Sequence, residues 1–198
     1  QLNSPKNGAD LLKLGSGVRV QKSQGGGGSP VIRGFEANRV LLVVDGIRLN
    51  NAIYRSGHLQ NAITIDPNYI ERVEVIHGSS SVGYGSDALG GVVHYYTKNP
   101  EINSNKKIKN SFSNYFSLAN FSNLNNFSNQ YSSKKWGLLT SVTFSNFNDI
   151  IIGKKRFHGF ENWGLTQLFY PNNNSLYQEN PSKNSNPRIQ KNTGYNQF

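Results

Sequence analysis

The chain contains no cysteine and no methionine among its 198 residues. Without cysteine it can form no disulfide, no thiolate metal site and no catalytic thiol. Because methionine is missing, no start codon is represented, and we expect a processed chain or a fragment. Only 35% of the residues are hydrophobic, which is little for a tightly packed globule of this length. The positions of the apolar residues therefore matter more than their number.

Long hydrophobic runs are also missing. No segment reaches the 18 or so consecutive apolar residues from which a membrane-spanning helix is recognised. No secretory signal peptide is visible, although a mature chain would have lost one. Neither absence excludes a membrane β-barrel, whose strands are short and only half apolar.

Acidic residues are scarce, with 11 Asp and Glu against 21 Lys and Arg, for a formal net charge of +10. The excess lies in small clusters beside Asn- and Ser-rich sequence, at 106–109, 134–135 and 154–156. Such clusters are typical of solvated loops, whereas a nucleic-acid surface gathers its charge on one face. We therefore expect no nucleic-acid partner.

The composition changes near Asn99-Pro100, where we expect a domain boundary that separates 1–98 from 99–198. Before it, short apolar segments alternate with glycine-rich turns, which predicts an α+β or mostly β domain. The run at 39–47 is almost continuously apolar and predicts a strand buried on both faces. The segment 70–76 alternates and predicts a half-exposed strand. Further strands are expected at 18–20, 31–35 and 91–98, a helix at 9–14, and a helical turn at 67–70 capped by Asp66.

After the boundary, Ser, Asn, Phe and Tyr dominate the sequence. One face of the segment 134–149 carries Trp136, Leu138, Thr140, Val142 and Phe144, and the other carries mostly small polar residues. This period of two, with aromatic residues at both ends of the apolar face, is typical of an outer-membrane strand. An ordinary soluble hairpin would show the same period. The segment 109–121 is a noisier version, in which Asn114 interrupts the face that carries Phe112, Phe116 and Leu118.

The glycines of 75–97 match the spacing of a dinucleotide-binding turn, with Gly83, Gly85 and Ala88 as G-x-G-x-x-A. A dinucleotide site needs a helix directly after this turn. Instead, paired glycines and β-branched and aromatic residues follow Ala88, and these favour a strand. No Walker-type lysine follows either. We therefore expect a strand, a glycine-rich turn and a second strand, with no nucleotide.

A resemblance to the plug domain of TonB-dependent outer-membrane receptors rests on three segments: VIRGFEANRVLLVVDGIRLN (31–50), IDPNYIERVEVIHG (65–78) and SSVGYGSDALGGVVHYYTK (80–98). It is strongest with the branch that takes up haem, haemoglobin and catecholate siderophores. The resemblance covers nearly all of 9–98. Beyond it, NDIIIGK (148–154) and NPRIQKNTGYNQF (186–198) are similar to early barrel segments of that branch.

The resemblance implies an α+β plug with a small mixed sheet and short helices at 1–98, followed at 99–198 by the first antiparallel strands of a 22-stranded transmembrane barrel. The alternating apolar pattern of a true barrel C-terminus is missing, so we expect Phe198 to be a truncation point. The chain would lie in the bacterial outer membrane, in contact with its lipid. TonB, with ExbB and ExbD, would engage an upstream TonB box that is not recognisable in 1–10. Family members often have Arg-Gly-Pro where this chain has His77-Gly78-Ser79.

The resemblance also implies roles for individual residues. The plug loop 50–66 would present Tyr54, Arg55, His58 and Gln60 to the transported haem, haem protein or siderophore, which is cargo and not a cofactor. His58, within Gly-His-Leu, is the candidate haem ligand. Other residues have structural roles in this interpretation. Contacts between plug and barrel are expected from Arg33, Glu71, Arg72 and Glu74, and turn geometry from Gly34, Gly46, Gly78, Gly85, Gly90 and Gly91.

Catalysis has no support in the sequence. The aspartates lie in turn-like contexts, no Ser/His/Asp set or carboxylate pair is specified by spacing, and His77, His94 and His158 lack metal-ligand spacing. We expect a transporter fragment for an iron source, and no enzyme and no metal site beyond haem iron at His58. The alternatives are an importer of glycans or peptides similar to the SusC family, and a β binding module without transport.

Overall fold

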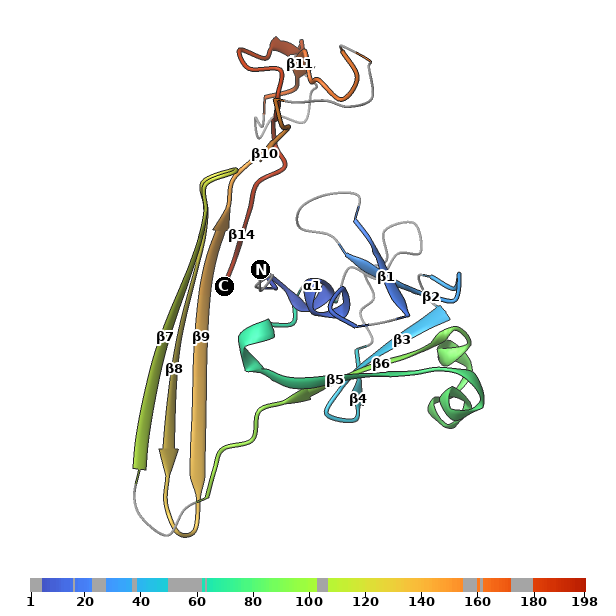
Figure 1. The fold of residues 1–198 in the computed structure, drawn as a ribbon, viewed down its shortest axis with the longest axis vertical. Coiled ribbons are helices and arrows are strands. Elements are labelled where there is room, and N and C mark those ends of the chain that lie inside the picture. The colour runs from blue at the N-terminus through green and yellow to red at the C-terminus, as the bar shows by residue number, and fades with distance from the viewer. Residues whose placement is uncertain are drawn as a thin grey trace.

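Two main sheets organise the chain in the computed structural model (Figure 1). The described residues are 5–15, 17–22, 28–36, 39–49, 62, 64–102, 107–154, 160, 162–171 and 180–198. One sheet, here called the mixed sheet, has the strand order β4-β3-β6-β5. The other, the long-strand sheet, has the order β14-β9-β8-β7. No helix in these ranges is long and apolar enough to cross a membrane.

The mixed sheet is built from β3 (Val40–Val44), β4 (Ile47–Arg48), β5 (Ile70–Ile76) and β6 (Gly91–Thr97). β6 is the central partner, parallel to β3 and antiparallel to β5, and β4 folds back on β3 through the Asp45-Gly46 turn. The apolar β3 is buried and β5 is half exposed, as the hydrophobic pattern predicted. The strand predicted over 39–47 nevertheless ends at Val44, because Asp45 and Gly46 form a turn with φ values of 47° and 84° and Ile47 begins the exposed β4.

An N-terminal layer of α1 (Gly8–Leu12), β1 (Val18–Gln21) and β2 (Ser29–Ile32) packs on one face of the mixed sheet (Figure 1). Asn7 caps α1, because its side chain accepts a hydrogen bond from the Asp10 N–H at 3.0 Å. The helix is shorter than the predicted 9–14, and a turn follows it. The core between the two layers consists of Ala9, Leu12, Ile32, Val40, Leu42, Ala62, Ile65, Val93 and Tyr95.

The other face of the mixed sheet is covered by two 3-10 segments, η4 (Gly78–Tyr84) and η5 (Ser86–Ala88). Ala88 packs there against Leu41, Val43 and Val92. Gly85 ends η4 with a φ of 96°, a conformation that disfavours any side chain. No α-helix follows Ala88, and β6 begins at Gly91, so the strand predicted after the glycines is confirmed.

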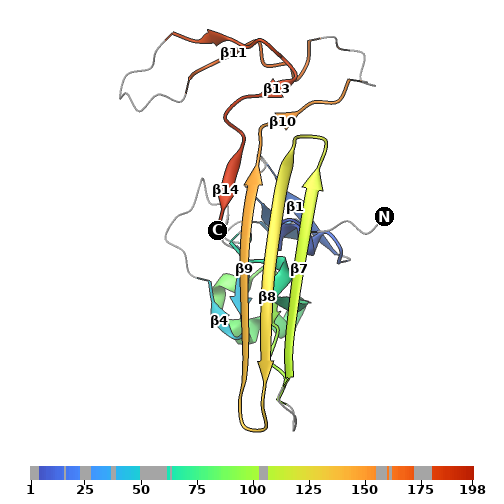
Figure 2. The ribbon, with the colours of Figure 1, turned by 90° about the vertical axis from the view of Figure 1, so that its left-hand side faces the viewer.

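The long-strand sheet consists of β7 (Lys107–Ser117), β8 (Ser122–Ser132), β9 (Gly137–Phe147) and the short β14 (Tyr195–Gln197), all antiparallel. It stands beside the mixed sheet as a single layer (Figures 1 and 2). Two small hairpin-like pairs lie beyond its upper end: β10 (Ile150–Ile151) with β13 (Ile189–Gln190), and β11 (Leu168–Phe169) with β12 (Ser182–Lys183).

Three further sequence-based expectations need correction. The strand predicted at 31–35 ends at Ile32, because Arg33 and Gly34 form a turn with φ values of 51° and 84° and Phe35 returns to Ile32 as an isolated bridge. The segment 109–121 is a strand only to Ser117, and Leu118 lies in the following turn. The strand β8 was missed, because its Asn- and Ser-rich sequence lacks the apolar alternation that was used to find β9.

Candidate functional site: the contact between the two sheets

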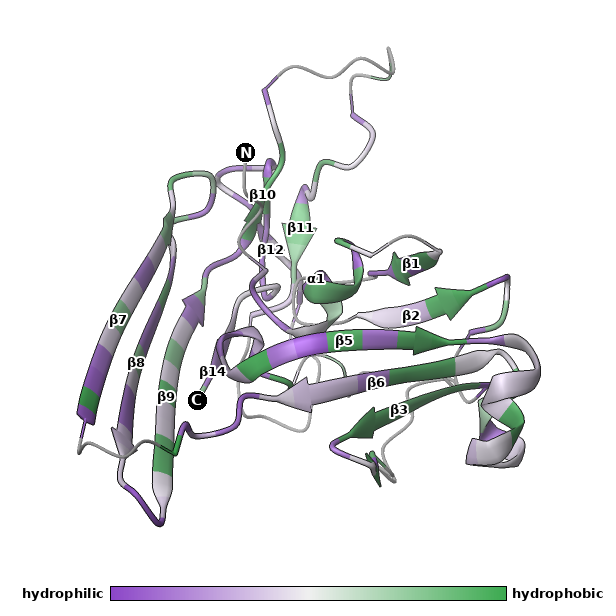
Figure 3. Cartoon of the chain, turned by 60° about the horizontal axis from the view of Figure 1, so that its bottom comes forward, coloured by the Kyte–Doolittle hydropathy of each residue, from purple (hydrophilic) through white to green (hydrophobic). Residues whose placement is uncertain are grey.

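The long-strand sheet has two chemically different faces. In β9 the odd-numbered residues point toward the mixed sheet and are more buried than the even-numbered residues on the opposite side. Figure 3 shows the resulting alternation of hydropathy along β9. We call the side toward the mixed sheet the inner face and the opposite side the outer face. The predicted apolar face of β9 is the outer face, where Leu138, Val142 and Phe144 are exposed.

The mixed sheet, the N-terminal layer and the 3-10 segments are here called the mixed-sheet domain. A series of hydrogen bonds joins the inner face to this domain. The Asn126 amide of β8 donates to the Thr143 hydroxyl of β9 at 2.7 Å, and that hydroxyl donates to Asp66 Oδ2 at 2.5 Å. The second oxygen, Asp66 Oδ1, accepts from the backbone N–H and the side-chain amide of Asn68 at 2.9 Å each. Asp66 therefore caps η3 (Pro67–Tyr69), as the sequence predicted, and also holds β9.

The segment before α1 forms a second contact between the sheets. The Lys6 ammonium lies 5.4 Å from the ring centroid of Tyr115 in β7 and 6.0 Å from that of Phe147 in β9. The Asn7 side chain, which is fully buried, lies near the Tyr195 side chain of β14, and its amide nitrogen donates no hydrogen bond within the described residues. Three strands of the inner face thus meet two consecutive residues of the chain.

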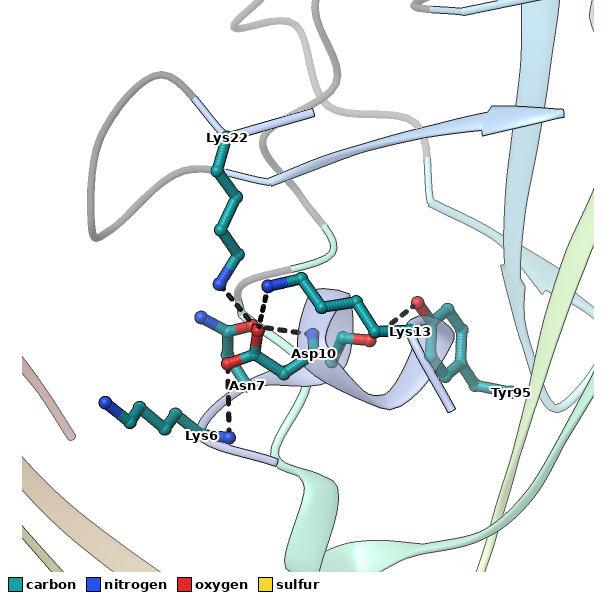
Figure 4. A network of polar contacts seen from close by, with 7 residues as sticks. Lys6, Asn7, Asp10, Lys13, Lys22 and Tyr95 are labelled. Carbon is teal, nitrogen blue, oxygen red and sulfur yellow. Dashed lines mark hydrogen bonds and ion pairs between the residues drawn. The ribbon is translucent and has the colours of Figure 1, made fainter. Parts of the chain in front are cut away.

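A network around Asp10 fixes this segment to the mixed-sheet domain (Figure 4). The Asp10 carboxylate pairs with Lys22 at 2.7 Å and Lys13 at 3.2 Å and accepts from the Lys6 backbone N–H at 3.3 Å. Burial alone would raise the Asp10 pKa, but the hydrogen bonds and charges of Lys22 and Lys13 hold it below its ordinary value. Asp10 is therefore ionised at neutral pH.

The backbone of the same segment is held by the core. Tyr95 of β6 donates its hydroxyl hydrogen to the Gly8 carbonyl at 3.2 Å, and the Gly8 N–H donates to the Ile65 carbonyl at 2.8 Å. Burial raises the pKa of Tyr95, so the hydroxyl stays protonated and remains a donor. A side chain at Gly8 would place its Cβ 2.4 Å from the Ala62 carbonyl oxygen. Only glycine fits this close approach.

Two of the predicted contact residues, Arg72 and Glu74 of β5, meet each other. Their side chains pair at 2.9 Å, and the Arg72 guanidinium lies 3.7 Å from the Tyr96 ring centroid. The Tyr96 hydroxyl donates to Glu74 at 3.0 Å, and the hydrogen bonds from Arg72 and Tyr96 lower the Glu74 pKa. Arg33 and Glu71 are exposed, Arg33 in a turn and Glu71 on β5. The predicted contacts of these four side chains with a barrel stay predictions.

A histidine that the sequence left without a role organises the far side of the mixed sheet. His94 is buried, its Nε2 accepts from the Gly46 N–H at 2.9 Å, and its ring stacks on Tyr96 at 4.1 Å between centroids. The Tyr84 hydroxyl lies 3.4 Å from Nδ1. Beside it, Asp45 accepts from the Thr97 hydroxyl at 2.6 Å and the Thr97 N–H at 2.9 Å, which lowers the Asp45 pKa. The spacing of Asp45 and His94 along the chain does not indicate this cluster.

The predicted turn glycines have two different roles. Gly90 lacks a positive φ, and a Cβ there would lie 2.3 Å from the Phe35 Cβ, so this position requires a close approach. The others adopt positive φ: Gly34, Gly46, Gly78, Gly85 and Gly91.

The predicted cargo-binding residues Tyr54, Arg55, His58 and Gln60 lie outside the described residues. Within the described ranges, no group of three or more His, Asp or Glu side chains could hold a metal ion.

A small mixed-sheet domain, held by polar contacts against the inner face of long alternating strands, defines a plug lying against part of a barrel wall. The family model of the TonB-dependent Receptor Plug Domain matches residues 1–92. Residues 1–92, somewhat under half of the chain, therefore resemble the plug domain of this family.

Curated relatives match a stretch of similar length. It is 45% identical over 94 residues to the vitamin B12 transporter BtuB of Vibrio vulnificus strain CMCP6, covering 46% of this chain and 15% of the relative. It is 39% identical over 90 residues to the hemin receptor of Yersinia pestis, covering 45% of this chain and 13% of the relative. The chain thus spans only a small fraction of the length of these relatives.

Solved structures share the fold over more of the chain. The copper transporter OprC superposes with a TM-score of 0.65 at 22% identity, covering 77% of this chain and 23% of that one. The FrpB iron transporter from Neisseria meningitidis gives a TM-score of 0.59 at 21% identity, with 78% and 23% covered. Each of these structures covers more than three quarters of this chain, whereas the plug-family match covers only residues 1–92. The shared fold therefore includes part of the long-strand sheet.

Proposed function

We propose that the chain is the N-terminal part of a TonB-dependent outer-membrane receptor, with 1–98 as its plug and 99–198 as the first part of its barrel. The observation that carries the proposal is the docking of the plug-family domain on the inner face through Asp66, Thr143 and Lys6. These contacts are polar and few, which suits a domain that must hold its position and still be displaced. The receptor would move its cargo without changing it chemically.

The proposed cargo is an iron source, haem or a ferric siderophore. Support comes from the hemin receptors among the relatives and from the Gly57-His58-Leu59 segment, where a neutral imidazole could bind ferric haem. Tyr54, Arg55 and Gln60 would contact its anionic groups, with arginine forming charge-assisted hydrogen bonds. A SusC-like glycan importer and a β module without transport are less consistent with this set of relatives.

A second candidate cargo is cobalamin, because a vitamin B12 transporter is 45% identical over 94 residues. Haem and cobalamin are both macrocycles that hold a metal ion. A variant at His58 can separate them, because the imidazole is proposed here as a ligand of haem iron and has no proposed role with cobalamin.

Energy would come from TonB, with ExbB and ExbD, through strand addition to a segment upstream of the plug. Force on that segment would reach Lys6, Asn7 and Asp10 first, because they join it to both sheets. Displacement of the plug would then free a path through the barrel.

The test expresses the full reading frame in an outer-membrane host that lacks its own receptors for haem, siderophores and cobalamin. We expect TonB-dependent growth on haem or a ferric siderophore, and loss of the haem Soret shift and of haem growth in His58→Ala. Growth on cobalamin alone would replace the iron assignment by the second candidate. Uptake that persists without TonB would overturn the proposed coupling.

A further inference from the structure

The outer face of the long-strand sheet carries no charged residue on its described strands, yet it is not uniformly apolar. The register of β7, β8 and β9 places the outer-face side chains in rows that run across the three strands. The central row is apolar and exposed, with Phe112 at 68%, Phe127 at 52% and Val142 at 43%. In the rows on both sides of it, asparagines occupy the β7 and β8 positions, and Thr140 and Phe144 occupy the β9 positions.

Hydrogen bonds join the asparagines across the strands. On one side of the central row, the Asn129 amide donates to the Asn110 carbonyl oxygen at 2.5 Å. On the other side, the Asn114 amide donates to Asn125 at 2.7 Å and to Asn123 at 2.8 Å. We call these the two asparagine bands. They explain why Asn114 interrupts the apolar pattern of β7.

Placing the two asparagine bands in lipid costs free energy, because part of their hydrogen-bonding groups has no partner there. Here the inference rests on the proposed function, which places these strands in a bilayer. Residues 110 and 114 lie about 13 Å apart along a strand, so both bands fit within an outward-facing apolar zone of about 25 Å. An asparagine can make several hydrogen bonds. The Asn110–Asn129 bond leaves the Asn110 amide nitrogen and the Asn129 carbonyl oxygen without a partner among the described residues. Acyl chains can satisfy neither group.

A second copy of the same receptor can satisfy both. Two copies inserted the same way up are related by a two-fold axis along the membrane normal, so equal depths face each other. Asparagine band then meets asparagine band, and the apolar row meets the apolar row. An amide is both donor and acceptor, so this pattern is self-complementary, and the absence of charge removes like-charge repulsion. Polar side chains that hydrogen-bond across an interface promote association between transmembrane helices, and the same physical reason applies to two strand faces in lipid.

We propose that the outer face of β7, β8 and β9 is an in-membrane contact surface between two copies of the receptor. Because the chain lacks cysteine, single engineered cysteines can map it. Asn129→Cys and Phe127→Cys, on the outer face of β8, are compared in native outer membranes with Ser128→Cys on the inner face. We expect oxidant-dependent homodimers from the two outer positions and none from Ser128→Cys.

A second experiment removes the asparagine band and keeps the fold. The double variant Asn110→Leu/Asn129→Leu should weaken the dimer by about tenfold in detergent titrations followed by single-molecule photobleaching. The matched control is Ser111→Ala/Ser128→Ala, which removes a 2.7 Å hydrogen bond between the same two strands on the inner face. The control should leave the dimer unchanged.

Uptake of cargo is measured in parallel, because it reports the proposed function separately. Normal TonB-dependent uptake without any outer-face homodimer would overturn the contact surface and leave the transport function standing. Cross-links only to a different protein would overturn it as well. Loss of membrane insertion in the parent receptor would instead refute the proposed function, on which the contact surface depends.

Discussion

Val43 of β3 and Val142 of β9 are both valines on β-strands, yet Val43 is 0% exposed and Val142 is 43% exposed. The mixed sheet is covered on both faces, by the N-terminal layer and by η4 with η5, and its interior is apolar. The long-strand sheet has one face that is partly covered and largely polar, and β7 is exposed on both faces over 107–114. The mixed sheet therefore gains its stability from apolar burial, whereas the long-strand sheet exposes apolar side chains and pairs polar side chains by hydrogen bonds.

The largest expected effect comes from matched leucine truncations in the two sheets. Leu42 of β3 is 1% exposed and Leu138 of β9 is 52% exposed. Leu42→Ala should destabilise the mixed-sheet domain by about 2–5 kcal/mol, because it leaves a cavity. Leu138→Ala should cost less than about 1 kcal/mol in the same detergent solution. Regional hydrogen exchange measures both, and equal losses would contradict the difference in burial.

Overpacking should have the next largest effect. A Cβ at Gly90 would lie 2.3 Å from the Phe35 Cβ and 3.0 Å from the Arg39 carbonyl, whereas nothing lies within 4 Å of one at Gly83. Gly90→Ala should destabilise the mixed-sheet domain by about 1–3 kcal/mol. Chemical unfolding checks this, with Gly83→Ala as the near-neutral control. A Gly90→Ala variant as stable as the parent would show that the η5 segment can move away from Phe35.

The Asp10 network should contribute a smaller, pH-dependent effect. Asp10→Asn should lower stability at pH 7 by about 1–2 kcal/mol, because it weakens the hydrogen bonds from Lys22 and Lys13. The pKa of Asp10 is held below the ordinary value of 3.8. The contribution of the ionised carboxylate is therefore complete well above pH 3.8 and is lost as the pH falls through the lower folded-state pKa.

Unfolding of the parent and the Asn variant, compared between pH 7 and pH 3, checks the sign of this dependence. The two curves should converge toward acid. A stability difference that grows on acidification would mean that Asp10 is not the stabilised anion. Lys13→Gln is a useful comparison, because Lys13 is half exposed and its loss should cost less than loss of Lys22.

The smallest effect is expected at the contact between the sheets. Thr143→Val removes the hydroxyl that donates to Asp66 at 2.5 Å and should weaken docking by about 1 kcal/mol with little change in folding. Thr140→Val, on the outer face of the same strand, is the control. Hydrogen exchange at 66–70 should rise only in Thr143→Val. Equal exchange in both variants would show that the Asp66 contact does not hold the two sheets together.

Much of the mixed sheet follows from local patterns in the sequence. The apolar run of β3, the alternation of β5 and the Asp66-Pro67 cap each encode their structure within a few residues. The outer face of β9 was predictable for the same reason, because its period of two is undisturbed.

The remaining features depend on partners far away in the sequence. Asparagine has a low strand propensity, so β8 is stabilised by its register with β7 and β9 and has no apolar pattern of its own. The turn at Arg33 requires a positive φ in a non-glycine residue, which the sequence VIRGF does not indicate. His94 and Gly46 are 48 residues apart, and their hydrogen bond exists only because β6 lies beside β3.

The two oxygens of the Asp66 carboxylate have different partners, and this affects the free energy needed to separate the mixed sheet from the long-strand sheet. Oδ1 is used by Asn68 within the mixed-sheet domain, and Oδ2 is used by Thr143 of β9. Separation of the sheets exposes only Oδ2, and a water molecule can replace the Thr143 hydroxyl there. The η3 turn keeps its cap throughout, so release and rebinding at this carboxylate can be reversible exchanges of one hydrogen-bond donor, without local unfolding.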